Sequence, residues 1–272
     1  GEVDGWLDAF LLQGELQTRI RARDLRMADN RLNGAAVDAR KLQIEIARGQ
    51  QPSRGTHVVW RAEGPLSVKA AQGRLGDFSV RDLSLSSGNL LAGGWGRAFE
   101  AQGPLTLTAD RLSGQDLDLR AVRGRVALDA VGDTDFRIGL RGSLSSRGAS
   151  YNGLGPIAAD DAPELARLKA AARSFDLSAP DLRFVMGTGH SELVLSAPAT
   201  LRPATGGTVT LSQGSGPIAI MASGQMRGSA RLVAEGGELP LLQMDVPRWT
   251  LNNGALDAAL KGNLKEVEAL FL

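Results

Sequence analysis

The feature that most constrains the fold of this chain is a two-residue alternation of apolar and polar side chains, repeated from one segment to the next. In residues 41–47 the apolar set is Leu42, Ile44 and Ile46, and polar residues fill the positions between them. Residues 104–109 alternate in the same way. Because successive side chains of a strand point to opposite faces, each segment has one apolar and one polar face. The simplest structure with such faces is an antiparallel sheet with one dry side.

The alternating segments fill most of the chain, and short turn signals separate them. Connections this short force neighbouring strands to be antiparallel. The turn signals are Asn33-Gly34, Gly49, Gly64-Pro65, Gly73, Gly88-Asn89, Gly103-Pro104, Gly114 and Gly132-Asp133. The expected strands of the first half cover residues 15–25, 30–38, 40–48, 56–63, 65–73, 77–86, 90–101, 104–111, 115–123, 124–131 and 135–147. Those of the second half cover residues 175–187, 189–197, 199–204, 207–213, 216–224, 227–235, 239–246 and 248–261.

Three segments depart from this alternation. Residues 3–12 place Trp6 and Phe10 at helical spacing and predict a short amphipathic helix. Asp160-Asp161 as a cap and an early Pro163 predict an alanine-rich helix over residues 161–173. The tail, residues 263–272, is expected to form a final helical turn or two.

Composition narrows the class of protein. With 272 residues, of which 43% are hydrophobic, the chain folds rather than remaining disordered. The absence of cysteine removes disulfides, thiol nucleophiles and cysteine-ligated metals. The formal net charge is +1, with Arg and Asp interspersed, so nucleic acid is not an expected partner. No window approaches the roughly 18 apolar residues of a membrane-spanning helix, and we expect the chain to be a fragment whose anchor or signal lies outside it.

A sheet of this many strands cannot stay flat and open. About eighteen strands joined by short turns must curl, split or close. The chain has 34 glycines and only 4% aromatic residues, so Leu, Val, Ile and Ala make up the apolar face. We therefore expect an all-β fold with one or two short helices. Residues 1–272 are expected to form a single long, curled antiparallel sheet, interrupted by the helix at 161–173, with its apolar face inside a trough.

Catalytic and metal sites are not expected. His190-Ser191-Glu192 brings a serine and a carboxylate near an imidazole, but adjacent residues of a strand point apart and cannot converge as a triad. The only other histidine is His57, and two histidines without cysteine make a poor zinc site. The sequence holds no phosphate loop, nucleophile elbow or dinucleotide fingerprint. We predict no enzyme activity and no cofactor.

Four segments carry a family resemblance: Arg21-Ala22-Arg23-Asp24-Leu25, Tyr151-Asn152-Gly153-Leu154-Gly155-Pro156, the helix from Pro163 to Phe175, and Asp176-Leu177-Ser178-Ala179-Pro180. Together with the hairpin-by-hairpin pattern, they resemble the YdbH branch of the AsmA-like proteins of Gram-negative bacteria, relatives of TamB. The resemblance implies a periplasmic protein, anchored to the inner membrane, whose folded sheet is called a β-taco. Such a sheet forms a hydrophobic groove that carries phospholipid between the inner and outer membranes. Envelope proteins at the groove ends are implied partners, and membrane contact is expected only through parts outside this chain.

The lining of such a groove is a set of residues spread over many strands. A lining of aliphatic side chains with few aromatic rings suits the sliding of a lipid, because it offers no deep pocket in which the lipid is trapped. For each residue the alternative role is packing in the core of a closed sandwich, and a bulge can move a strand's residues to the other face. The candidate lining residues are Leu42, Ile44, Ile46, Val58, Trp60, Leu66, Val68, Phe78, Val80, Leu83, Leu85, Leu105, Leu107, Leu117, Leu119, Val126, Leu128, Phe136, Ile138, Leu140, Leu193, Leu195, Val209, Leu211, Ile218 and Ile220.

The helix over residues 161–173 has two alternative roles. In the first, its Leu165, Leu168 and Ala172 face packs on one end of the groove as a lid or plug. In the second, it is a connector that covers an exposed edge strand. We expect the connector.

Two functions from different classes remain. The first is a non-catalytic groove that binds phospholipid and conducts it between the two membranes of a Gram-negative bacterium. The second is a structural or adhesive all-β body with a sealed core and no lipid. A groove leaves much of its aliphatic face accessible, whereas a sealed body does not.

Overall fold

The computed structural model describes residues 11–27, 30–51, 55–75, 78–96, 98–114, 116–187, 190–221, 225–239, 242–252 and 255–262. These residues form a 15-stranded sheet and one short helix, α1 (Pro163–Arg173). Every strand pair is antiparallel, which confirms the predicted fold class. The first eight strands are β1 (Leu11–Met27), β2 (Asn30–Gln51), β3 (Gly55–Leu75), β4 (Phe78–Trp95), β5 (Ala98–Gly114), β6 (Leu117–Gly132), β7 (Phe136–Tyr151) and β8 (Phe175–Gly187). The others are β9 (His190–Leu195), β10 (Ala199–Pro203), β11 (Thr208–Gln213), β12 (Ile218–Met221), β13 (Met226–Glu235), β14 (Leu242–Asn252) and β15 (Ala255–Gly262).

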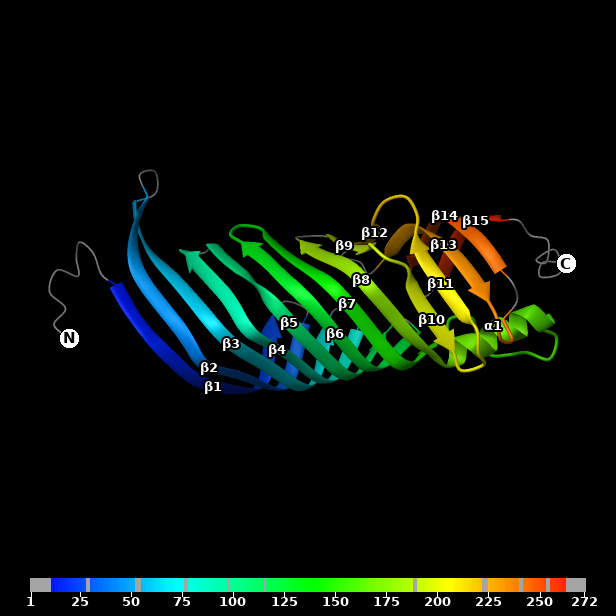
Figure 1. Cartoon of the computed structure of the whole chain (residues 1–272), viewed down its shortest axis with the longest axis horizontal. Helices are drawn as coiled ribbons and strands as arrows, with labels where there is room; N and C mark the ends of the chain where they lie inside the picture. Colours follow the sequence, from blue (N-terminus) through cyan, green and yellow to red (C-terminus); the bar gives the residue numbers. More distant parts are fainter. Residues whose placement is uncertain are drawn as a thin grey trace.

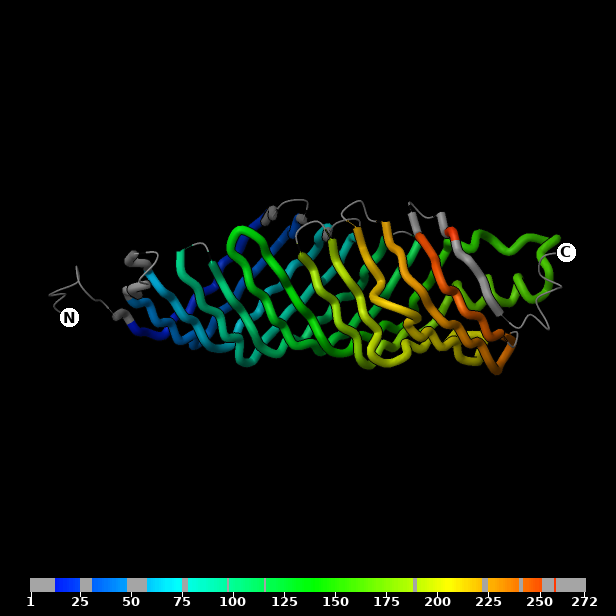
Figure 2. Tube along the Cα trace, turned by 90° about the horizontal axis from the view of Figure 1, so that it is seen from above, coloured from blue at the N-terminus to red at the C-terminus, as the bar shows by residue number. Residues whose placement is uncertain are grey.

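The sheet is curled lengthwise into a trough. Figure 1 shows the long strands running down one wall, bending at the base and rising again behind it. Seen from above in Figure 2, the two walls slant in opposite directions, and the strands follow one another along the long axis. Strand β1 lies at one end of this axis, and α1 lies with β13 to β15 at the other.

The strands of the first half are much longer than the sequence predicts. The expected strands 30–38 and 40–48 are one strand, β2, and the expected strands 56–63 and 65–73 are one strand, β3. Of the turn signals, Gly114 and Gly132-Asp133 lie at strand ends, and all the others lie within strands. The count of about eighteen strands is wrong because a glycine that permits a turn also permits a bulge inside a continuous strand. The expected strand 90–101 is also wrong, since β4 ends at Trp95 and β5 begins at Ala98.

Two lines of irregular backbone cross the sheet and bend it. Strand register aligns Gly34, Asp82 and Ala121 in a first bend line, where φ is 61°, 51° and 46°. A second bend line contains Gly64 and Gly103, where φ is 145° and 151°. The register of β3 and β4 shifts directly after Gly64. Because left-handed residues and bulges kink a strand, these lines convert a flat sheet into a trough.

The second bend line explains two of the Gly-Pro pairs. A Cβ on Gly64 would lie 2.9 Å from the backbone oxygen of Lys41, and one on Gly103 would lie 2.7 Å from that of Asn89. Only glycine therefore fits at these positions, where the neighbouring backbone passes close by. The same type of glycine recurs at Gly142, and the three stand at equal spacing along the chain on β3, β5 and β7.

In the second half, four short strands take the place of two long ones. Each pair of short strands is separated by a break at the position where the strands of the first half bend. β9 and β10 both pair with β8, and β12 and β11 both pair with β13. At the first break the amides of Ser196 and Ala197 donate to the backbone oxygen of Asp181 at 2.9 and 3.2 Å. At the second, the amide of Gly214 donates to the backbone oxygen of Ser229 at 3.0 Å. In the second half of the sheet, a loop therefore stands at the bend, where the first half has a bulge.

Helix α1 confirms the predicted helix but not its predicted cap. Its N-cap residue is Ala162, which makes no side-chain capping hydrogen bond. Asp161 instead accepts two hydrogen bonds of 2.8 Å from Lys169 and one of 2.8 Å from the Ala158 amide. For the expected helix over 3–12, residues 3–10 lie outside the described residues, and Leu11 and Leu12 belong to β1. The expected helical turn over 263–272 also lies outside them.

Candidate functional site: the apolar face of the curled sheet

The apolar face of the sheet lies on the inside of the curl. Val80, Leu83 and Val122 are only 5%, 6% and 2% exposed. A side chain on a single-layer sheet becomes this buried only when other residues cover its face. Here the cover comes from the sheet itself as it bends over, so the apolar face is concave and the polar face is outside.

Strand register joins the apolar positions of successive strands into continuous rows. Each residue of a row lies directly opposite the next one on the neighbouring strand. One row, called here the alanine row, runs through Ile44, Ala62, Ala92, Ala101, Ala130, Ile138 and Met186. A second row runs through Val37, Val68, Leu85, Leu107, Gly124 and Leu144. The face is therefore one uninterrupted apolar surface from β2 to β8.

The candidate lining residues lie on this face and fall into three groups by exposure. Val80, Leu83, Leu119 and Ile218 are buried. Val58 and Phe136 are exposed. All the others are half-buried, which means that part of each aliphatic side chain remains open to a molecule inside the trough.

The buried residues gather beside the first bend line. They form one cluster, called here the bend cluster, which takes residues from every strand between β3 and β8. For Val80, Leu83 and Leu119 the alternative role of core packing is therefore the one that the structure shows. The members of the bend cluster are Ala70, Val80, Leu83, Ala109, Leu119, Val122, Ala149 and Phe175.

The wall beyond the second bend line is more open. It carries the alanine row together with two aromatic rings that lie over glycines of the next strand. A Cβ on Gly94 would come within 2.9 Å of Trp60 Nε1, and one on Gly132 would overlap the ring of Phe99. Small residues along this wall leave room above the sheet. We refer to this part of the apolar face as the open wall.

Sequence reasoning missed several residues of the open wall, among them Ala62, Ala101 and Phe99. A usable signal was present, since Phe99, Ala101 and Gly103 continue the period of Leu105 and Leu107 without interruption. The signal was hidden because Gly103-Pro104 was assigned to a turn. That assignment ended one expected strand and reset the phase of the next.

Helix α1 packs on the apolar face at one end of the sheet. Its buried Ala171 contacts Ala234 and Leu239, and Leu168 packs against the same cluster. Val209 and Leu242, which lie opposite Ala234 on the neighbouring strands, complete it. The expectation that α1 is a connector over an edge strand is wrong, because the contacts of α1 lie on the inner face and not on an edge. This end of the apolar face is covered.

A largely covered ion pair fixes α1 to the segment before it. Lys169 and Asp161 are 11% and 9% exposed, and Lys169 Nζ also donates to the backbone oxygen of Pro156 at 3.0 Å. Hydrogen bonds from Lys169 and then from the Ala158 amide hold the pKa of Asp161 below its ordinary value. The carboxylate is therefore ionised at neutral pH and holds the helix in place.

Charged side chains occupy the outer face. Near the first bend line, Asp118 accepts hydrogen bonds from Arg111 at 2.5 Å and from Arg120 at 3.1 Å. Burial acts to raise the pKa of Asp118, but the hydrogen bonds from Arg111 and Arg120 outweigh it and hold that pKa below its ordinary value. These ion pairs thus cross-link the polar face by charge.

The His190 motif does not converge in the structure. His190, Ser191 and Glu192 follow one another along β9, so their side chains alternate between the two faces. Within the described part of the chain, no three His, Cys, Asp or Glu side chains come together as metal ligands. Nor does that part contain a helix with the length and apolar character needed to cross a membrane.

Comparison of the chain with protein-family models, with curated proteins and with solved structures finds no match.

Proposed function

We propose that the curled sheet is a non-catalytic lipid-binding groove that conducts phospholipids between the inner and outer membranes of a Gram-negative bacterium. The observation that carries the proposal is the uninterrupted apolar face inside the trough, most of whose aliphatic residues are half-buried rather than sealed. Acyl chains occupy this face, and headgroups remain at the solvated opening. The site of action is the periplasm, where the full-length protein is anchored to the inner membrane.

The energetics of lipid transfer agree with such a surface. Holding one methylene group in water costs about 0.8 kcal/mol, so a fully exposed acyl chain of about 16 carbons costs on the order of 12 kcal/mol. A continuous aliphatic surface removes this barrier at every point along its length. No bond is made or broken, so the groove needs no catalytic residue.

The composition of the open wall suits movement rather than storage. Ala62, Ala92 and Ala101 stand opposite one another on successive strands, so the alanine row has no projecting side chain across β3 to β5. Larger side chains such as Leu85 and Leu107 stand in the parallel row. An acyl chain that lies along the alanine row meets a smooth surface and no deep pocket.

The alternative is a structural or adhesive body with a sealed core. The bend cluster has the burial that a sealed core requires, whereas in the alanine row of the open wall Ala130 is buried and the other residues are half-buried. A large accessible apolar surface on a folded protein is typical of a binding site and is a liability in a purely structural one. This difference favours the groove.

Co-purified lipid tests the proposal directly. We would analyse the purified chain by native mass spectrometry and by lipid extraction, and compare it with the variant Ile44→Arg/Ile138→Arg. Both residues lie in the alanine row, outside the bend cluster, so charge enters the open wall while the packed part is kept. We expect phospholipid on the unmodified chain and its loss from this variant, with unchanged circular dichroism.

The matched control is Gln43→Arg/Gln102→Arg, which adds the same charge on the outer face. Gln43 lies opposite Glu15 and Glu63, and Gln102 lies opposite Asp129, so both new arginines face a carboxylate. This control should keep its lipid. An unmodified chain that carries no lipid, or a control that loses as much lipid as the open-wall variant, would contradict the groove.

A further inference from the structure

A second feature lies on the outer face of the sheet, away from the groove. It is a hollow of about 420 Å³ over β1 to β4, called here the cationic hollow. Four basic side chains border it, Arg19, Arg21, Arg40 and Lys69, and Asp38 is the one acidic residue among the described residues that line it. Its volume falls within the roughly 300–1,000 Å³ typical of small-molecule sites. The residues that border the hollow therefore carry a clear excess of positive charge.

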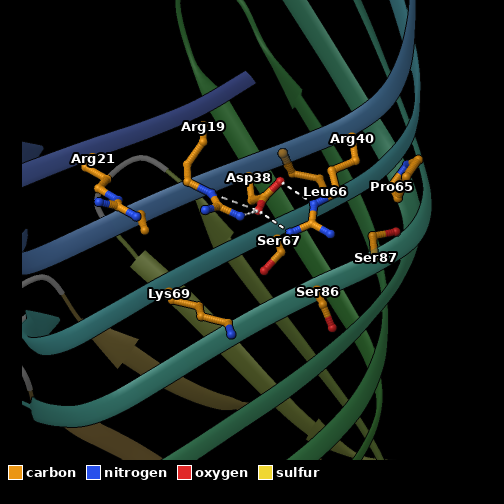
Figure 3. A pocket seen from close by; sticks show the side chains of 11 residues that line it. Arg19, Arg21, Asp38, Arg40, Pro65, Leu66, Ser67, Lys69, Ser86 and Ser87 are labelled. Carbon is orange, nitrogen blue, oxygen red and sulfur yellow. Dashed lines mark hydrogen bonds and ion pairs between the residues drawn. The ribbon is translucent and has the colours of Figure 1, made fainter. Parts of the chain in front are cut away.

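Part of this charge is fixed by Asp38. The carboxylate accepts hydrogen bonds from Arg19 at 2.7 and 3.1 Å and from Arg40 at 3.1 and 3.2 Å. Hydrogen bonds from Arg40 and then from Arg19 hold the pKa of Asp38 below its ordinary value. One carboxylate thus orients two guanidinium groups and leaves one of their two charges uncompensated (Figure 3).

Arg21 and Lys69 are the free members of the hollow. Within the described residues, neither side chain takes part in a hydrogen bond or an ion pair. Register places Arg21 opposite Ala36, and Ala36 opposite Lys69. The two basic residues are thus two strand spacings apart, about 10 Å between backbones, with only a methyl group between them. Both side chains are long enough to reach one small anion held above Ala36.

Hydroxyl groups complete the hollow. Ser67 and Ser86 lie opposite each other on β3 and β4 and offer donors beside the basic groups. Ser87 also borders the hollow, but it lies opposite Leu66 on the apolar side of the sheet, so its buried hydroxyl is not one of these donors. Basic side chains together with hydroxyl donors are the groups that proteins use to bind phosphate.

We propose that the cationic hollow binds a phosphate-bearing anion, with Arg21 and Lys69 as its direct ligands. Asp38 acts as a positioning residue, since it holds Arg19 and Arg40 at the border of the site. Such a phosphate belongs either to a lipid headgroup at a membrane surface or to a soluble phosphomonoester. The site lies on the polar face, so the proposal does not depend on whether the apolar face conducts lipid.

Two binding measurements on the same proteins test the site and identify the source of the phosphate. The first is a calorimetric titration with glycerol 3-phosphate at low ionic strength. The second is flotation with phosphatidylglycerol vesicles, with phosphatidylcholine vesicles as the uncharged comparison. The variant is Arg21→Gln/Lys69→Gln, and the matched control is Arg123→Gln/Arg125→Gln, which removes the same charge from the polar face of β6.

We expect the unmodified chain and the control to bind, and the hollow variant to bind at least tenfold more weakly, which corresponds to about 1.4 kcal/mol or more. Binding in the titration assigns the site to soluble phosphate compounds as well, whereas binding to phosphatidylglycerol vesicles alone assigns it to a headgroup. The proposal is overturned if the unmodified chain binds neither probe. It is equally overturned if the two variants lose binding to the same extent, because the effect is then one of general charge.

Discussion

The bend cluster and the open wall lie on the same strands and on the same face, yet burial is far more complete in the bend cluster, since Ala130 is the one buried member of the alanine row. Strand β6 shows this within a single element, since Leu119 is 4% exposed in the bend cluster and Leu128 is half-buried in the open wall. The difference arises because the sheet folds over itself beside the first bend line and not beyond the second. Backbone geometry, rather than hydrophobicity, therefore divides the apolar face into a part that holds the fold and a part that stays available.

Truncation of one leucine in each region should give the largest difference. Leu119→Ala removes a covered side chain and should lower the free energy of unfolding by about 2–5 kcal/mol. Leu128→Ala removes a side chain that is already partly in water and should cost about 1 kcal/mol. Urea denaturation of both variants measures the two values. Equal losses would mean that the open wall is packed as tightly as the bend cluster.

The bend itself can be tested at its glycines. Gly103→Ala places a Cβ against the backbone oxygen of Asn89, at a φ that favours glycine, and should cost about 1–3 kcal/mol. Gly88→Ala is the control, because a Cβ at Gly88 meets no atom within 4 Å, and its effect should stay within about 0.5 kcal/mol. Thermal unfolding of both variants reports the difference. If the two alanines cost the same, the close approach at the second bend line does not constrain the fold.

A smaller effect is expected from the charges outside the bend. The pKa of Asp118 is lowered in the folded state, so its stabilisation is present above the unfolded pKa of about 3.9 and is lost as the pH falls through the lower folded value. Asp118→Asn should therefore cost about 1 kcal/mol at neutral pH and flatten the loss of stability below about pH 4.

Asp129 provides the comparison on the outer face, behind the open wall. It is 71% exposed and lies 4.0 Å from Arg137, so Asp129→Asn should leave both the stability and its pH dependence nearly unchanged. Urea midpoints measured between pH 3 and pH 7 test the pair. If the pH profile of Asp118→Asn matches that of the unmodified chain, Asp118 does not stabilise the bend. Packing of the bend cluster is then sufficient to hold it.

The sequence was sufficient to predict the face of the sheet but not its bends. Leu42, Ile44 and Ile46 alternate without interruption, and the structure places them on the apolar face as a strand of that period requires. The bends depend on positive φ at Asp82, a residue type that is only moderately enriched in this conformation, and at Ala121, which carries no local signal for it. Gly64-Pro65 was ambiguous because a turn and a bulge both use glycine. Strand lengths therefore depended on contacts between strands, which one sequence does not display.

For the candidate site, too, features set by local pattern could be predicted and features set by distant contacts could not. The face on which a residue of a regular strand lies, such as Leu140, could be predicted because the period of the strand is local. Burial was not predictable, since Leu119 and Leu128 have the same residue type and differ only in what covers them. The role of α1 was also missed, because the residues that meet Ala171 come from strands far along the chain.

Gly64, Gly103 and Gly142 recur at equal spacing along the chain. The cross-section of the trough and its length are therefore determined independently of each other. Each hairpin carries its own bend, so the width and depth of the channel are set within each hairpin. Its length is then simply the number of hairpins. A gene that duplicates one hairpin lengthens the conduit by one step without redesigning its section, and the distance that such a protein spans can evolve independently of the cargo it fits.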